Sequence, residues 1–150
     1  MDEVALELQL TLRPDAAAAS VGRHVVRGLA PVLDLAVLES TELLVSELVT
    51  NSLRHAGSPQ PIELQLSVTA GGGVKGEVFD MGDGFPGPPK SVRFPGQQAT
   101  SGWGLYLVEN IAHRWGVRED GGTTVWFEID PPRHIDLRRR ELAFGRSSAG

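Results

Sequence analysis

Three polar side chains recur every four residues in the stretch SELVTNSLRHAG, residues 46–57, namely Glu47, Asn51 and His55. On an α-helix this spacing places them on one stripe, beside a face of leucine and valine residues that is expected to be buried. A glutamate there can position or deprotonate a nucleophile, and an asparagine can offer an oxygen to Mg²⁺, which prefers hard oxygen ligands. A solvated helix edge accounts for the stripe equally well when it is taken alone, and His55 also fits a charge partner at a helix C-terminus.

A second candidate for chemistry is DMGDGF, which follows directly after the stretch GEVF. Asp80 ends a predicted strand, and Gly82 and Gly84 would let the backbone turn sharply and approach a ligand closely. A carboxylate at a strand end can accept a hydrogen bond from an exocyclic amino group such as that of adenine. An ordinary Asp-Gly turn is the alternative for this fragment by itself.

Two further stretches carry groups suited to a phosphate or a base. SGWGLYLV places Gly102, Gly104 and Leu105 at the start of a predicted helix, whose free N–H groups and positive dipole end favour phosphate. A hinge for a flexible lid is compatible with the same glycines. GGTTVWFEI places Thr123 and Thr124 at the start of the final strand. A threonine hydroxyl there would either face a ligand or belong to an ordinary strand, in which β-branched residues are common.

The elements that must position these groups follow from the periodicity of the apolar residues. Strict alternation over VALELQLTLR predicts a half-buried strand, and DAAAASVGRHVVRGLA predicts a helix. The remaining expected elements are a helix over 36–55, strands over 62–70 and 74–80 joined by three glycines, a helix over 104–115 and a hairpin over 115–130. Because hairpins dominate the strand pairing, the expected fold is α+β, a two-layer α/β sandwich with a mixed, mostly antiparallel sheet and helices on one face.

The composition narrows the class of protein. A net charge of −5 argues against direct nucleic-acid binding, the absence of cysteine excludes disulfides and thiolate metal sites, and no apolar run is long enough to span a membrane. No basic-then-apolar leader opens the chain, so a cytoplasmic protein is expected. We expect one domain over residues 1–130 and a loosely ordered tail over 131–150, which carries an arginine cluster.

The order of these weak motifs is more specific than any one of them. A helical Glu-x-x-x-Asn, a strand-end Asp-x-Gly-x-Gly, a Gly-x-Gly before a helix and a Gly/Thr strand start together resemble the GHKL (Bergerat-fold) ATP-binding superfamily, over about residues 4–130. ELVTNSLRHA resembles its N-box, DMGDG its adenine-contacting box, and GWGLYLV its lid-and-phosphate box. With LLVSELVTNSLRHAG and TVWFEI, the chain is most similar to the bacterial anti-sigma-factor serine/threonine kinases.

The resemblance implies ATP and Mg²⁺ as the bound groups and a role for each matching residue. Glu47 would be the catalytic base, Asn51 would ligate Mg²⁺, and Asp80 would accept a hydrogen bond from adenine. The same matching implies that Gly82 and Gly84 shape the adenine pocket and that Thr124 lines it. The backbone of Gly102, Gly104 and Leu105 would contact the phosphates, and residues 85–101 would form a lid over the nucleotide.

The resemblance also implies partners and an activity. The chain would sequester a sigma factor and phosphorylate an anti-anti-sigma antagonist of the STAS type, as a homodimer. Many relatives carry a basic residue where this chain has Trp103 and a lysine where it has Thr123, and both changes remove positive charge near the expected phosphates. These departures favour an alternative function, a nucleotide-sensing interaction module without useful catalysis. A sensor histidine kinase fragment is disfavoured, because no phosphoacceptor helix pair precedes the first strand.

Overall fold

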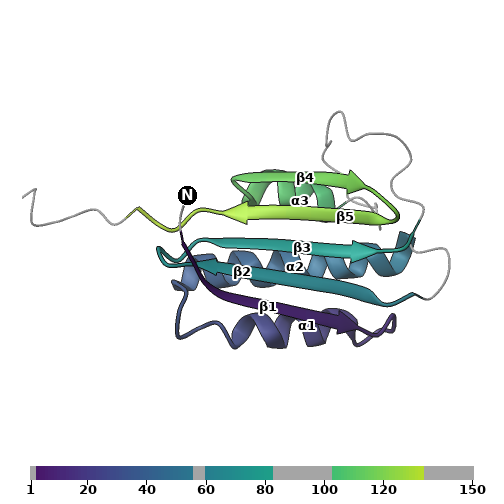
Figure 1. Cartoon of the computed structure of the whole chain (residues 1–150), viewed down its shortest axis with the longest axis horizontal. Helices are drawn as coiled ribbons and strands as arrows, with labels where there is room; N and C mark the ends of the chain where they lie inside the picture. The colour runs from purple at the N-terminus through teal and green to yellow at the C-terminus, as the bar shows by residue number, and fades with distance from the viewer. Residues whose placement is uncertain (1–2, 56–59, 83–102, 134–150) are drawn as a thin grey trace, which may run out of the picture.

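An antiparallel sheet carries its helices on one face, as the computed structural model shows for residues 3–55, 60–82 and 103–133, which are the residues it describes (Figure 1). Its five strands lie in the order β1-β2-β3-β5-β4, and every described pair is antiparallel. The expected α+β two-layer sandwich is therefore confirmed. In chain order the elements are β1 (Val4–Leu12), α1 (Ala18–Arg27), α2 (Leu35–His55), β2 (Ile62–Thr69), β3 (Val74–Asp80), α3 (Trp103–Ile111), β4 (Arg114–Glu119) and β5 (Thr123–Ile129).

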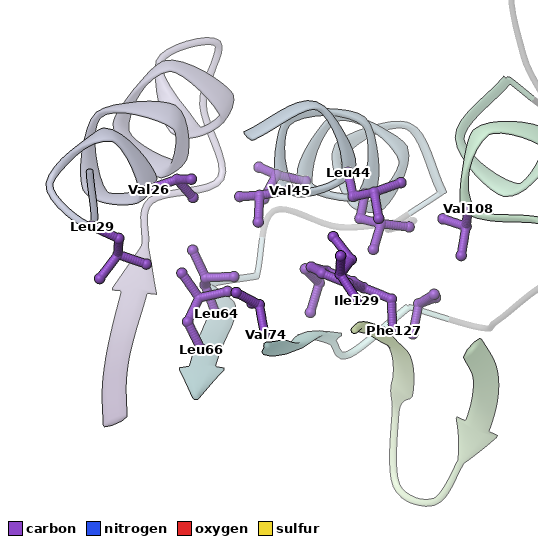
Figure 2. Close-up of a cluster of buried hydrophobic side chains, with 14 of the residues drawn as sticks. Val26, Leu29, Leu44, Val45, Leu64, Leu66, Val74, Val108, Phe127 and Ile129 are labelled. Carbon is purple, nitrogen blue, oxygen red and sulfur yellow. The ribbon is translucent and has the colours of Figure 1, made fainter. Parts of the chain in front are cut away.

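The core lies between the helices and the sheet (Figure 2). Along β2, β3 and β5, buried residues alternate with more exposed ones, as expected for strands with one covered face. The covered positions of these strands meet the apolar face of α2, which is the most deeply buried helix. The core residues that fix this packing include Leu64, Leu66, Val78, Phe127 and Ile129 from the strands and Val26, Leu44, Val45, Leu48 and Val108 from the helices.

Helix α3 ends four residues earlier than its sequence pattern predicts. The apolar period continues to Trp115, yet the helix ends at Ile111 and β4 begins at Arg114. The reason is strand pairing: the N–H of His113 donates to the carbonyl of Glu128 at 2.9 Å, and Arg114 then pairs with Glu128 in the β4–β5 ladder. Tertiary pairing with β5 overrides the local helical pattern at these residues.

The edge strand β1 contains an irregularity at its start. The register with β2 shifts between Val4 and Leu6, so that Val4 lies opposite Thr69 while Leu6 lies opposite Val68. A bulge of this kind re-aims a side chain relative to the regular alternation. Val4 is consequently directed to the sheet face that α1 and α2 leave uncovered, and it is 55% exposed.

Several sequence-based expectations fall outside the described residues. These are the stop of α2 at Gly57, the proposed lid over 85–101, and most of the tail beyond Arg133. Among the residues that the structure does describe, no helix combines the length and apolar character needed to cross a membrane.

Candidate functional site

Glu47 and Asn51 lie on the margin of α2 that faces away from α1. Arg23 of α1 donates from Nη1 to the Oγ of Ser46 at 2.7 Å, which fixes the side of α2 that is turned toward α1. At 100° per residue, Glu47 and Asn51 lie roughly 100° and 140° further around the helix than Ser46. Both side chains are half-buried at the edge of the core face. The stripe predicted from the sequence is therefore not a fully solvated edge.

Asn51 lies level with the end of β3 at which Asp80 is found. Near the start of α2, Val37 lines the same cavity as Ile129, and Ile129 is paired with Val74 at the start of β3. From Val37 to Asn51 the helix rises by roughly 21 Å, at 1.5 Å per residue. From Val74 to Asp80 the strand rises by roughly 20 Å, at 3.3 Å per residue. The two polar groups thus reach the same end of the sandwich.

Helix α3 completes this end of the helical layer. Ser40, on the same stripe as Glu47, lines a cavity together with Ile111 and His113, which lie at and just after the end of α3. Because α3 ends beside the start of α2, its first turn points toward the Asp80 end of the sheet. Leu105, in that first turn, is half-buried and packs against the core. Helix α3 therefore offers its N-terminus to the same region.

Asp80 is a buried carboxylate at the end of β3, with only 7% of its surface exposed. It belongs to the covered face of the strand, and its Oδ1 accepts the backbone N–H of Gly82 at 2.8 Å. Within the described ranges no ion pair involves Asp80. A carboxylate has room for further donors beyond one amide. A buried anion without a cationic partner suits a neutral ligand that donates a hydrogen bond, as an exocyclic amine does.

Thr123 lies directly opposite Asp80, although of the two threonines at this strand start the resemblance gave the pocket role to Thr124. Thr123 and Asp80 are paired across β3 and β5, and Thr123 is 4% exposed. Its Oγ1 lies 3.5 Å from the carbonyl oxygen of Gly82, the glycine that also donates to Asp80. The buried hydroxyl and carboxylate therefore form one polar cluster on the helix side of the sheet.

Thr124 is not brought to this cluster. It pairs with Phe79 on one side and with Arg118 on the other, one residue out of phase with Asp80. Its side chain therefore lies on the open face of the sheet. The signal that could have separated the two threonines is the alternation that follows them, because the buried residues of β5 are Thr123, Val125, Phe127 and Ile129.

The remaining predicted site residues are only partly described. Gly82 is described and adjoins Asp80, and Gly104 lies in the first turn of α3. Gly84 and Gly102 lie outside the described residues, and so does the side chain of His55. The roles assigned to these positions stay predictions.

The residues that are described fit a nucleotide with a divalent ion. No cluster of three or more His, Cys, Asp or Glu side chains able to hold a metal occurs in the described part of the chain. Mg²⁺ in nucleotide sites is usually held by one or two protein oxygens together with substrate phosphates and water, not by a cage of protein ligands. A single amide oxygen from Asn51, at the end of the sandwich where Asp80 lies, matches that mode of binding.

Comparison with known families decides the class of this site. The sequence profile described as the histidine kinase-like ATPase domain matches residues 11–129, which is most of the chain. The chain belongs to the histidine kinase-like ATPase family. Membership in this ATPase family implies nucleotide binding, in agreement with the buried Asp80 and the polar margin of α2.

One solved structure extends the comparison to the fold. The crystal structure of the RsbU and RsbW domains of Rv1364c from Mycobacterium tuberculosis is similar to this histidine kinase-like ATPase, with a TM-score of 0.66 and 21% sequence identity. The match covers 86% of this chain and 33% of the mycobacterial chain, so this protein spans about a third of that chain's length. No curated protein sequence matches this chain.

Proposed function

We propose that this ATPase-family protein is an anti-sigma factor and serine/threonine-protein kinase that uses ATP with Mg²⁺. The observation that carries the proposal is the position of Glu47 and Asn51, on the margin of α2 away from α1 and level with the buried Asp80. The residues that we propose as base, metal ligand and adenine acceptor thus lie along one end of a family ATPase domain. The similarity to a structure that contains an RsbW domain supports the same assignment.

The mechanism assigns one task to each residue. Asp80 would accept a hydrogen bond from the adenine amino group and so orient the nucleotide. The amide oxygen of Asn51 would hold Mg²⁺, whose chemistry is to neutralise charge on the phosphates. Glu47 would accept the proton of the attacking serine hydroxyl as the bond from its oxygen to the γ-phosphorus forms and the bond to the ADP oxygen breaks. Positioning and charge neutralisation are most of what phosphoryl transfer requires, so this small set of residues is sufficient.

The proposed partners are a sigma factor, a STAS-type anti-anti-sigma protein and a second copy of the chain, in the cytoplasm. Apolar side chains at the β1 and α1 edge support the homodimer, since Leu6 is 37% and Val21 is 45% exposed. An edge strand with uncovered apolar residues is a natural pairing surface. Light scattering after size exclusion tests this: Leu6→Glu should convert a dimer into a monomer, and a monomeric unsubstituted protein contradicts the homodimer.

A second candidate function is a nucleotide-sensing interaction module with little or no phosphoryl transfer. The observation that favours it is the absence of basic side chains at Trp103 and Thr123, where many relatives carry them. Thr123 is buried beside Asp80, so at this position the chain has a hydroxyl where many relatives have a cation. Such a protein would still bind ATP and respond to it.

A phosphotransfer assay separates the two functions. The purified protein is incubated with Mg²⁺ and ATP labelled at the γ-phosphate, together with a panel of STAS-type proteins. Transfer to an antagonist should fall by roughly 10²–10⁴-fold in Glu47→Gln, the range expected for loss of a general base. The matched control is Glu39→Gln, an exposed carboxylate on the same helix, which should transfer normally. Tight ATP binding without transfer to any antagonist would refute the kinase and leave the sensing module.

A further inference from the structure

The open face of the sheet carries a groove at the end opposite to Asp80. It has a volume of about 560 Å³ and lies over the start of β3, the end of β5 and the start of β1. In the described part of the chain the helices all lie on the other face, so none covers it (Figure 1). The groove is lined by charged side chains, five of them from strands and one from the residue that follows β5. They are Glu7, Lys75, Glu77, Arg114, Glu128 and Asp130.

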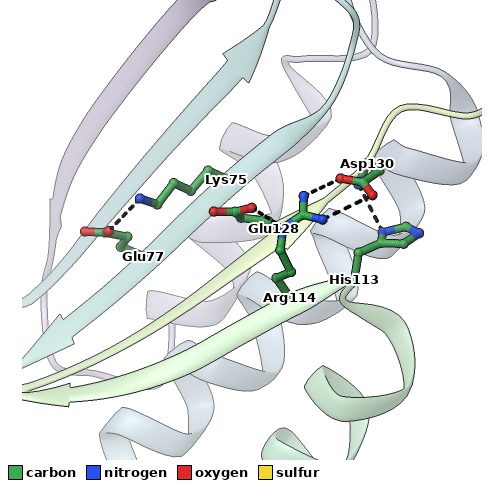
Figure 3. Close-up of polar contacts among 6 residues, drawn as sticks. All are labelled: Lys75, Glu77, His113, Arg114, Glu128 and Asp130. Atoms are coloured by element: carbon green, nitrogen blue, oxygen red, sulfur yellow. Dashed lines mark hydrogen bonds and ion pairs between the residues drawn. The ribbon is translucent and has the colours of Figure 1, made fainter. Parts of the chain in front are cut away.

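The charges of this groove are unbalanced. Four lining carboxylates face two lining cations, and Arg118 pairs with one of these carboxylates, Glu77, which leaves a net of −1. Arg114 donates from Nε to Glu128 at 2.6 Å and from Nη2 to Asp130 (Figure 3). Hydrogen bonding to Arg114 holds the pKa of Asp130 below its ordinary value, so this carboxylate stays ionised. On the opposite side, Glu77 is paired with two cations, Lys75 at 3.6 Å and Arg118 at 3.1 Å.

Glu7 is the least compensated carboxylate of the groove. It lies on the edge strand β1 and accepts a hydrogen bond from the side-chain amide of Gln65 at 3.2 Å. Among the described residues no cation is paired with it. Beside it, the bulge of β1 directs Val4 into the same groove with 55% of its surface exposed. An uncompensated acid next to an exposed valine fits a ligand that is both basic and apolar.

The chain itself supplies such a ligand. Seventeen residues follow Arg133, and they contain four arginines against two acids, a net of +2 with histidine neutral. Three of those arginines are consecutive, at 138–140, and the apolar residues of the segment include Ile135, Leu137, Leu142, Ala143 and Phe144. The charge and the apolar content of this segment are complementary to those of the groove.

The attachment point and the length of the segment permit the contact. Pro131 lines the groove, so the chain leaves β5 at its rim. From β5 to β1 there are three strand spacings, which is roughly 14 Å. The seven residue steps from Pro131 to Arg138 span up to roughly 23 Å when extended. A segment tethered so closely has an effective concentration in the millimolar range, which makes individually weak contacts significant.

We propose that residues 134–150 dock in cis into this open-face groove, with the arginines at 138–140 beside Glu7 and the apolar residues over Val4. The groove is then an intramolecular binding site for the chain's own basic C-terminal segment. This inference does not depend on phosphoryl transfer or on nucleotide, because the groove and the Asp80 cluster lie on opposite faces and at opposite ends of the sheet.

Paramagnetic relaxation tests the docking directly in the full chain. The protein has no cysteine, so a nitroxide on Ala143→Cys is its single label. If the effective concentration of the segment and the dissociation constant of the contact are both about millimolar, the segment is docked about half of the time. The amide signals of Ser67 and Lys75 should then have roughly half the intensity that they have with the reduced label. The amide of Glu39, on the helix side, should keep its intensity. The broadening should disappear when the arginines at 138–140 are replaced by alanine, and also at high salt.

Two charge reversals complete the design. Glu7→Lys should remove the broadening at Ser67, whereas the matched control Glu39→Lys should retain it. Broadening that is confined to the helix side, or that is unchanged in the arginine variant or in Glu7→Lys, overturns the proposal. Broadening that appears when labelled protein is mixed with isotope-enriched, label-free protein also overturns it, since the segment would then bind a second copy and not its own chain.

Discussion

Gly76 and Gly116 lie under aromatic rings on the two faces of the sheet, and they should respond differently to the same substitution. A Cβ at position 76 would lie closer than 3.0 Å to the ring of Phe127, a distance that real Cβ atoms essentially never show. Phe127 is completely buried at the centre of the core, so its ring cannot move aside without disturbing its neighbours. At position 116 the Cβ would lie 2.7 Å from Nε1 of Trp126, whose ring is only half-buried.

The expected magnitudes follow from these surroundings. Overfilling a close-packed core costs about 1–3 kcal/mol. Replacing glycine by alanine returns about 0.4–1 kcal/mol by restricting the unfolded chain. Gly76→Ala should therefore destabilise by up to about 2.6 kcal/mol, which lowers Tm by up to roughly 10 °C for a chain of this length. In Gly116→Ala the indole can swing toward solvent, so the two effects should cancel to within about 0.5 kcal/mol.

Urea unfolding monitored by circular dichroism gives both free energies from the midpoint and the slope. The decisive variant is Gly76→Ala combined with Phe127→Leu, because the smaller side chain relieves the clash. The double variant should be more stable than the sum of the single losses predicts. Equal losses for Gly76→Ala and Gly116→Ala, or strict additivity in the double variant, would refute the reasoning from ring mobility.

Three further predictions concern the site and the ion pair between Arg114 and Asp130. Asp80→Asn should weaken ATP binding in calorimetry by about 10–100-fold, because a charged acceptor contributes about 1.5–3 kcal/mol; unchanged affinity would remove Asp80 from the base pocket. Thr123→Val should weaken ATP binding while Thr124→Val leaves it unchanged, and the reverse order would contradict the strand phase. Arg114 lowers the pKa of Asp130 in the folded state. The pair therefore stabilises the fold fully above the unfolded carboxyl pKa of about 3.9, and this stabilisation is lost as the pH falls through the lower pKa of the folded state. The stability difference between the unsubstituted protein and Arg114→Met should accordingly be constant near neutral pH and shrink below about pH 4 in urea titrations, and a difference that grows there would contradict the pairing.

Much of the fold could be predicted from local patterns. The alternation of β2, β3 and β5 and the long apolar face of α2 have strong periods, and their types and order agree with the structure. The strand order could not be predicted in the same way. Pairing of β5 with β3 places β4 at the edge, and this depends on contacts between residues distant in sequence. The early end of α3 has the same origin, because residues 113–115 are taken by a ladder that the local period cannot reveal.

The candidate site shows the same division between local and long-range information. Glu47, Asn51 and Asp80 could be selected from the sequence, because each is a polar residue at an unusual place in an apolar element. Choosing between Thr123 and Thr124 required the register of β5 against β3, which the sequence expresses only weakly through the residues that follow. A threonine is acceptable on either face of a strand, so its type alone carried no information about its direction.

The short turn between β4 and β5 has a consequence for how this protein can change over evolutionary time. Gly121 has a φ of +68°, and a Cβ on Gly122 would lie 2.6 Å from the backbone oxygen of Asp80. Adding or removing one residue in this turn would exchange Thr123 and Thr124 between the two faces and turn Phe127 out of the core. The length of a surface turn thereby determines which hydroxyl the ligand meets. Among related chains, this turn should be the connection whose length varies least, even where its own residues make no contact with nucleotide.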